Sequence, residues 1–120
     1  METDNLAKVT PSLRNLFFEL REGIRSLGCV REKICTGRYY CYYSGSKPST
    51  KFVEVQALPT KNCLSIISKI DNNQTYDEGF ARPVPESHKW GKYVRFTINE
   101  SSQLGEAMRL IRDAYNWVLD

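Results

Sequence analysis

The stretch from residue 93 to residue 119 constrains the fold more than any other part of the chain. Tyr93 to Ile98 alternates without interruption between two faces, with apolar side chains on one of them, which is typical of a half-buried β-strand. From Ser101 to Leu119, apolar residues recur at helical spacing and form one stripe. This strand and the amphipathic helix after it predict a helix that packs on one face of a sheet.

A second amphipathic helix is predicted near the N-terminus. Thr10 and Pro11 indicate its start, because a hydroxyl caps the first turn and proline lacks an N–H that has no helical partner there. Apolar residues cover one face from Leu13 to Leu27, and Gly28 is a typical C-terminal cap. Residues 1–9 are polar without a sustained period, so we expect them to be a loosely held lead-in.

Between the two helices the apolar period changes to that of β-strands. Strand-like runs of alternating or aromatic residues occupy residues 30–35, 38–43, 51–57 and 64–70. The connections between them are short and rich in turn residues, which favours antiparallel pairing. Residues 71–91 are mostly polar and contain Pro83 and Pro85, so we expect one long loop there.

These elements predict an α+β fold in one domain that spans residues 1–120. We expect an antiparallel sheet of four to five strands, with the N-terminal and C-terminal helices packed on one face. A chain of 120 residues is long enough to bury a core without disulfides or metals. The other face of the sheet is then left to solvent, to the long loop or to a partner.

Composition excludes several classes of protein. No apolar run approaches the roughly 20 residues of a membrane-spanning helix, so we expect no membrane partner. The four cysteines contain no C-x-x-C pair and the first residues do not resemble a secretion signal, so we expect a cytoplasmic protein. The formal net charge of +3 is too small by itself to indicate a nucleic-acid partner.

The chain resembles an uncharacterised family of small domains, from about Leu13 to Tyr115. The matching segments are Tyr42 and Gly45, Phe52–Val55, Leu64–Ile70, Glu78–Val84, His88–Gly91 and Met108–Tyr115. Members are described as predicted transport proteins and are sometimes appended to nuclease-like domains. Lys89 here separates His88 from Trp90, which usually adjoin in that family. The resemblance implies the α+β topology and a nucleic-acid-related context, and it supplies no catalytic residue.

An aromatic and basic set of residues is the main candidate for a binding surface. Aromatic side chains on an open sheet can stack on bases while lysine and arginine contact phosphates. The set consists of Tyr40, Tyr42, His88, Lys89, Trp90, Lys92, Tyr93 and Arg95. The alternative is that the tyrosines merely suit strands, Trp90 covers the core and the lysines solubilise strand edges. We therefore expect a non-catalytic binding module whose partner is a nucleic acid or a protein.

The run of tyrosines leaves its own orientation open. Residues 39–43 read Tyr-Tyr-Cys-Tyr-Tyr, so Tyr40 and Tyr42 share one face and the three residues between and beside them share the other. One of these sets must face outward.

On the last helix, Leu110 and Trp117 lie off the main apolar stripe, and exposure of both would indicate protein contact or self-association.

Catalysis and small-ligand binding are weaker hypotheses. Glu54 on a strand is similar to the acidic strand of a metal-dependent nuclease, although no lysine follows it two positions later. The cysteines and the single histidine form no short chelating pair, so we expect no metal or cofactor and assign no catalytic residue. Four loop acids near Arg82 can line a pocket for a small ligand; they are Asp71, Asp77, Glu78 and Glu86.

Overall fold

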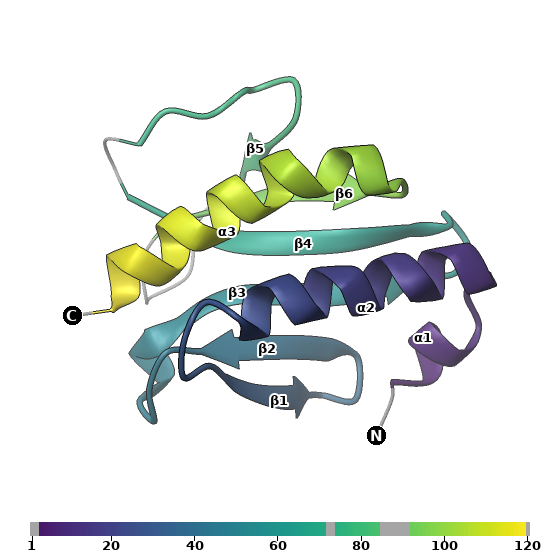
Figure 1. The fold of residues 1–120 in the computed structure, drawn as a ribbon, viewed down its shortest axis with the longest axis horizontal. Coiled ribbons are helices and arrows are strands. Elements are labelled where there is room, and N and C mark those ends of the chain that lie inside the picture. The colour runs from purple at the N-terminus through teal and green to yellow at the C-terminus, as the bar shows by residue number, and fades with distance from the viewer. Residues whose placement is uncertain (1–2, 72–73, 85–91, 120) are drawn as a thin grey trace.

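The structure is a computed structural model that describes residues 3–71, 74–84 and 92–119. In this part of the chain six antiparallel strands form one sheet, and two long helices lie on one of its faces (Figure 1). The strands are β1 Arg31–Cys35, β2 Tyr39–Tyr43, β3 Lys51–Leu58, β4 Cys63–Ile70, β5 Arg82–Pro83 and β6 Lys92–Ile98. Their order across the sheet is β1-β2-β3-β4-β6-β5. The α+β class is confirmed, and the expected number of four to five strands is wrong.

The additional strand is β5, at the edge of the sheet beyond β6. Arg82 and Pro83 pair with Arg95 and Val94, and the backbone N–H of Val84 donates to the Tyr93 carbonyl at 2.9 Å. Proline cannot donate to a strand ladder and is therefore confined to edges, which is where Pro83 lies. The two prolines in this segment indicated a loop, and the expectation of one uninterrupted loop over residues 71–91 is corrected at β5.

Helix α2, Pro11–Arg25, begins as the sequence predicts. The Thr10 hydroxyl accepts a hydrogen bond from the Leu13 N–H at 3.3 Å, so it satisfies a donor that has no helical partner. The helix ends before Gly28, and Ser26 is its C-terminal cap. Gly28 has a packing role instead, because a Cβ at this position would lie 2.2 Å from the Tyr115 hydroxyl oxygen.

Helix α3, Leu104–Val118, follows the 3-10 turn η2, Ser101–Gln103, and a second such turn, η1, covers Pro48–Thr50 before β3. Glu100 and Gln103 form a capping box in which each side chain bonds to the backbone of the other residue. The predicted start near Ser101 is therefore confirmed, with Glu100 as the capping residue. No helix in the described part of the chain is long and apolar enough to cross a bilayer.

A short N-terminal helix corrects the expected lead-in over residues 1–9. Helix α1, Asp4–Ala7, is capped by Thr3, whose hydroxyl accepts from the Leu6 N–H at 3.2 Å. The Thr3 N–H donates to the Tyr40 hydroxyl at 3.0 Å, and Leu6 is fully buried. This segment is thus packed against the sheet by a capped turn and one apolar side chain, a pattern too short to show a period.

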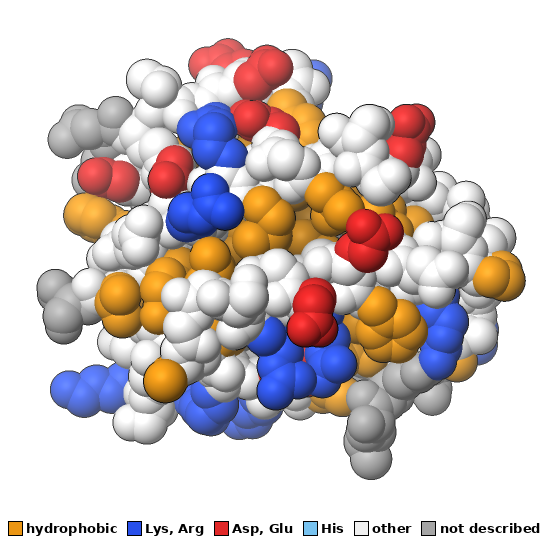
Figure 2. Space-filling view, viewed as in Figure 1, with side chains coloured by type: hydrophobic (Ala, Val, Ile, Leu, Met, Phe, Trp, Pro, Cys, Tyr) orange, Lys and Arg blue, Asp and Glu red, His pale blue; other side chains and the backbone are white. Residues whose placement is uncertain are grey.

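The hydrophobic core lies between the helices and the sheet. Its fully buried side chains come from every layer and include Phe17, Leu20, Tyr42, Phe52, Ile66 and Ile111. Hydrophobic side chains also reach the surface along the seam between α2 and α3, while charged side chains occupy much of the surface on either side (Figure 2). The helix-bearing face is therefore the side of the sheet where the core is built.

Candidate binding surface on the open face of the sheet

The strand register aligns side chains in rows across the face opposite the helices. One row crosses all six strands and consists of Lys33, Cys41, Glu54, Ile67, Arg95 and Arg82. No described helix covers this face, so we call it the open face. Cations lie at both ends of the row, and its only described acid, Glu54, lies in the middle strand β3.

A hollow of about 640 Å³ lies on the open face over the central strands, and we call it the central hollow. Its lining includes Tyr39, Lys51, Glu54, Lys61 and Arg95, together with small polar side chains of β4 and β6. Ligand sites in proteins commonly have volumes of roughly 300–1,000 Å³. The central hollow thus combines the size of a ligand site with cationic residues on several sides.

Lys51 and Glu54 form an ion pair in this hollow, with 2.5 Å between Nζ and Oε2. Their side chains are only 17% and 12% exposed. Burial is the largest single influence on the pKa of Lys51 and acts to lower it, but the hydrogen bond to Glu54 and the negative charge of Glu54 together raise the pKa above its ordinary value. Lys51 therefore stays charged, and the Glu54 carboxylate is already bonded to it.

The described residues do not assemble a metal centre around Glu54. No group of three histidine, cysteine, aspartate or glutamate side chains comes together within residues 3–71, 74–84 and 92–119. The hypothesis of a nuclease-like acidic strand gains no support from the Glu54 contacts.

Tyr40 and Tyr42 lie on the helix-covered face, which corrects their expected place beside Tyr93 and Arg95. They are 3% and 0% exposed, and the Tyr40 ring packs on Phe17 with 4.6 Å between centroids. In register they lie opposite Val55 and Val53, two residues that alternation had already assigned to one face of β3. Matching the two strands in register was the signal that could have oriented the tyrosines.

The polar tips of both tyrosines have partners that compensate for burial. The Tyr42 hydroxyl donates to Glu32 Oε2 at 2.8 Å, and Arg21 donates two hydrogen bonds to the same carboxylate at 2.7 and 2.9 Å. The hydrogen bonds from Arg21, opposed by burial and aided by Tyr42, lower the pKa of Glu32. This bidentate contact also ties α2 to β1.

Three other tyrosines occupy the open face. Tyr39 is half-buried and lines the central hollow. Tyr43 is 9% exposed, and the Arg31 guanidinium carbon lies 4.6 Å from its ring centroid. Burial is the main cause that raises the pKa of Tyr43 to about 12. Tyr93 is 2% exposed, so Tyr39 is the tyrosine of this face most available for contact.

The remaining predicted site residues fall into three groups. Arg95 is exposed on the open face, and Tyr93 shares that face by alternation. Lys92 is exposed at the start of β6, pairs with Ile70 and belongs by alternation to the helix-covered face. Three predicted residues lie outside the described part of the chain: His88, Lys89 and Trp90.

Arg82 joins Arg95 in a second hollow of about 460 Å³, which we call the edge hollow. It lies where β5 pairs with β6, and its lining also includes Gly79, Phe80 and Thr97. Val84, Arg95 and Thr97 line both hollows, so the two are neighbours. This role for Arg82 could not be predicted from the sequence, because a two-residue strand with proline has no recognisable pattern.

Two cysteines of the open face are thiols without signs of activation. Cys35 and Cys41 are both free and line the central hollow. Burial, with hydrogen bonding to Cys35 as a second cause, raises the pKa of Cys41 well above its usual value. Cys41 is therefore protonated at neutral pH and is a poor nucleophile.

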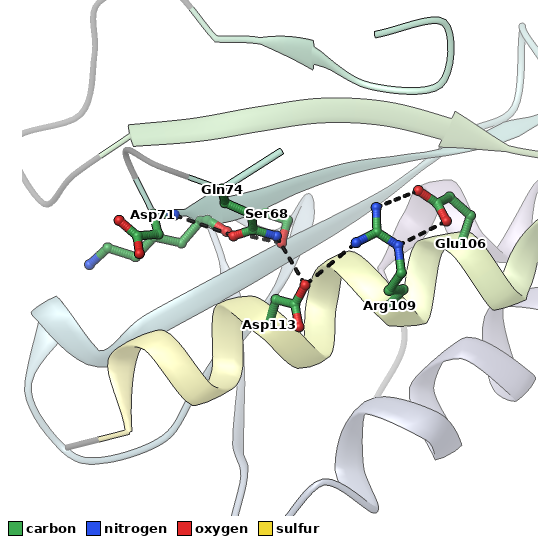
Figure 3. A network of polar contacts seen from close by, with 7 residues as sticks. Ser68, Asp71, Gln74, Glu106, Arg109 and Asp113 are labelled. Atoms are coloured by element: carbon green, nitrogen blue, oxygen red, sulfur yellow. Dashed lines mark hydrogen bonds and ion pairs between the residues drawn. The ribbon is translucent and has the colours of Figure 1, made fainter. Parts of the chain in front are cut away.

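The acids expected around Arg82 do not gather there. Asp71 belongs to a contact network that ties the segment after β4 to α3 (Figure 3). Gln74 accepts from the Asp71 N–H at 3.4 Å and donates to Asp113 at 3.1 Å, and Arg109 lies 3.6 Å from the same Asp113 carboxylate. This network belongs to the helix side, away from the edge hollow.

The other expected loop acids also contribute nothing to the edge hollow. Asp77 and Glu78 are exposed in the turn before β5, and Glu86 lies outside the described residues. The described lining of the edge hollow contains no acid. The described residues therefore place no acid beside Arg82 in the edge hollow, and a pocket for a small polar or cationic ligand at this loop stays a prediction.

Comparison with known proteins identifies a family for this chain, and the description of that family gives no function. A family model described as a domain of unknown function, DUF5655, matches residues 2–117. Searches of curated proteins and of solved structures gave no match. The match agrees with the resemblance to an uncharacterised small domain, and its description mentions neither transport nor a nuclease-like neighbour.

Proposed function

Because this chain belongs to the DUF5655 family, whose function is unknown, we propose a function from its own surface: a non-catalytic module that binds single-stranded nucleic acid on the open face of its sheet. The observation that supports this most is the central hollow, where Lys51, Lys61 and Arg95 accompany an accessible tyrosine. Both long helices lie on the other face, so no described helix covers this one (Figure 1).

The charge distribution favours a polyanionic ligand. The row across the open face carries Lys33 at one end and Arg95 with Arg82 at the other, while its acid is bonded to Lys51. Cationic side chains spread over several β-strands match the regularly spaced phosphates of a nucleic acid better than they match one small anion. Binding then releases counterions, so affinity falls as the salt concentration rises.

Tyr39 supplies the aromatic contact in this proposal. Tyr39 lines the hollow and is half-buried, so part of this residue is accessible there. Stacking of a base on an aromatic side chain contributes about 1–3 kcal/mol and tolerates any sequence. The proposed module therefore binds with little sequence preference.

The free thiols and the family resemblance support a cytoplasmic location and a nucleic-acid ligand. All four cysteines are free, which suits a reducing cytoplasm. Similarity to domains that are sometimes appended to nuclease-like domains supports nucleic acid over other polyanions. The description of such relatives as transport proteins has no counterpart in the described surface.

Fluorescence anisotropy with labelled single-stranded RNA and DNA tests the proposal. We expect binding that weakens steeply between 50 and 200 mM salt, and Arg95→Gln should reduce the salt slope by about one. Arg112→Gln is the matched control, because Arg112 is an exposed arginine on α3, on the helix side. Absence of salt-sensitive binding at high micromolar concentration, or equal losses in both variants, would overturn the proposal.

A protein partner is the second candidate, and Trp117 favours it. The Trp117 side chain is 51% exposed near the end of α3, and Leu119 is 50% exposed beside it. Leu110, the other residue off the apolar stripe, is 1% exposed and belongs to the core. Of the two residues off the apolar stripe, Trp117 alone is therefore exposed, and loss of partner binding in Trp117→Ala with unchanged anisotropy of the nucleic acid would separate the two functions.

A further inference from the structure

We infer that Arg82 and Arg95 form a site for a phosphate monoester at the edge of the sheet. When a single-stranded nucleic acid is bound, this monoester is its terminal phosphate. That the ligand is a single-stranded nucleic acid rests on the proposed function. That the bound group is a phosphate monoester rests on the geometry of the edge hollow.

The two arginines are paired across neighbouring strands. Arg82 on β5 lies directly opposite Arg95 on β6 in antiparallel register, so both side chains lie on the open face. Both residues are exposed, and among the described residues neither forms an ion pair. Like charges directly opposite one another destabilise a sheet. A doubly charged anion between them would convert this repulsion into two attractions.

The edge hollow offers the donors that such an anion requires. Each guanidinium presents a planar fork of N–H groups that matches phosphate oxygens in a bidentate manner. Thr97 is exposed on the same face two positions after Arg95 and adds a hydroxyl to the lining. The nearby N–H groups of Gly79 and Val84 already donate to Asp77 and Tyr93, so side chains would supply the binding contacts.

The position at the sheet edge favours a terminal phosphate over an internal one. β5 has only two residues, and among the described strands none lies beyond it. A nucleic acid that lies in the central hollow and extends past Arg95 and Thr97 therefore enters the edge hollow, beyond which the described sheet ends. A phosphate monoester carries about −1.5 to −2 charges near neutral pH, which matches two guanidinium groups, whereas an internal diester carries one negative charge.

Paired oligonucleotides with and without a terminal phosphate test the inference by anisotropy. We expect the wild-type protein to bind the phosphorylated strand at least about tenfold more tightly, the effect of one lost charged hydrogen-bond pair. Arg82→Gln should abolish this preference, so that the phosphorylated and unphosphorylated strands bind this variant with equal affinity. Arg112→Gln should keep the preference, and thermal melts confirm that each variant is folded.

The outcomes separate the inference from the proposed function. Equal, salt-sensitive binding of both strands overturns the terminal-phosphate site and leaves the nucleic-acid module standing. If no strand binds but inorganic phosphate raises the melting temperature of the wild type and not of Arg82→Gln, the phosphate site stands and the nucleic-acid function falls. If neither strands nor phosphate bind, both are overturned, and a preference that persists in Arg82→Gln also overturns the site.

Discussion

Arg95 lies directly opposite Arg82 across the last strand pair of the sheet, and each is exposed on the face that the helices leave open. Proteins usually place opposite charges at such positions, because a like-charge pair weakens the sheet. Arg95 lines both hollows and Arg82 lines the edge hollow, so the pair places cations where an anionic ligand can contact them.

Removing one charge of this pair should not destabilise the free protein. We predict that Arg82→Gln keeps or raises the free energy of unfolding in low salt, by up to about 1 kcal/mol, because cross-strand repulsion is relieved. Salt screens the repulsion, so the gain should shrink at 0.5 M salt, where the Debye length is about 4–5 Å. Urea unfolding at both salt concentrations measures this. A clear loss of stability in low salt would mean that Arg82 has a structural role instead.

Gly28 and Gly105 should respond to alanine in opposite directions. A Cβ on Gly28 would collide with the buried Tyr115 hydroxyl, so Gly28→Ala should cost about 1–3 kcal/mol. A Cβ on Gly105, inside α3, meets nothing within 4 Å, so Gly105→Ala should stabilise by about 0.5–1 kcal/mol. Thermal or urea melts compare the two variants. Partial rescue of Gly28→Ala by Tyr115→Phe would identify the hydroxyl as the obstacle.

Glu32 should make the protein sensitive to acid. Its pKa is held below the ordinary 4.5 in the folded state, chiefly by hydrogen bonds from Arg21. A depressed carboxyl pKa contributes stability that is present above the unfolded pKa and is lost as pH falls through the folded pKa. The urea midpoint of the wild type should therefore fall between pH 6 and pH 3 by more than that of Glu32→Gln.

Glu106→Gln is the matched control for the acid prediction. The Glu106 carboxylate also pairs with an arginine, Arg109, but on the exposed surface of α3 where solvent weakens the interaction. Its substitution should change the pH dependence less than Glu32→Gln does. An identical fall of the midpoint in wild type and Glu32→Gln would contradict the role assigned to Glu32.

The Lys51 and Glu54 pair should behave as a unit. Glu54→Leu alone leaves the Lys51 ammonium mostly buried without its partner, and we predict a loss of about 2 kcal/mol or more. The double variant Lys51→Met/Glu54→Leu removes both charges and should recover most of that loss. Urea unfolding of the two single variants and the double variant gives the coupling energy. Additive losses would show that the pair does not act together.

The elements with a clear period could be predicted from sequence, because burial on one face imposes it. β6 and α3 carry their apolar residues at the spacing of a half-buried strand and an amphipathic helix, and the structure has both. The cap at Thr10 was equally readable, since its hydroxyl is used in the first turn of α2.

Other features could not be predicted because their cause is tertiary. The aromatic run of β2 has nearly the same character on both faces, so its sequence does not show which face is buried. Pairing with β3 turns Tyr40 and Tyr42 inward, where their hydroxyls bond to Thr3 and Glu32. β5 exists because β6 offers an edge for pairing, and no local signal marks two residues with proline as a strand. The arginine pair of the candidate site follows from that pairing.

Chemical-shift mapping distinguishes the open face of the sheet from the helix side as the surface that binds single-stranded nucleic acid. A short single-stranded oligonucleotide with a terminal phosphate is titrated into isotope-labelled protein, and backbone amide shifts are followed residue by residue. If the open face binds the strand, we expect shifts concentrated on open-face positions of β3, β4, β6 and β5, including Gln56, Ser65, Thr97 and Arg82, with α2 and α3 little affected. Shifts concentrated on α3 around Trp117, or no shifts at millimolar ligand, would contradict binding at the open face.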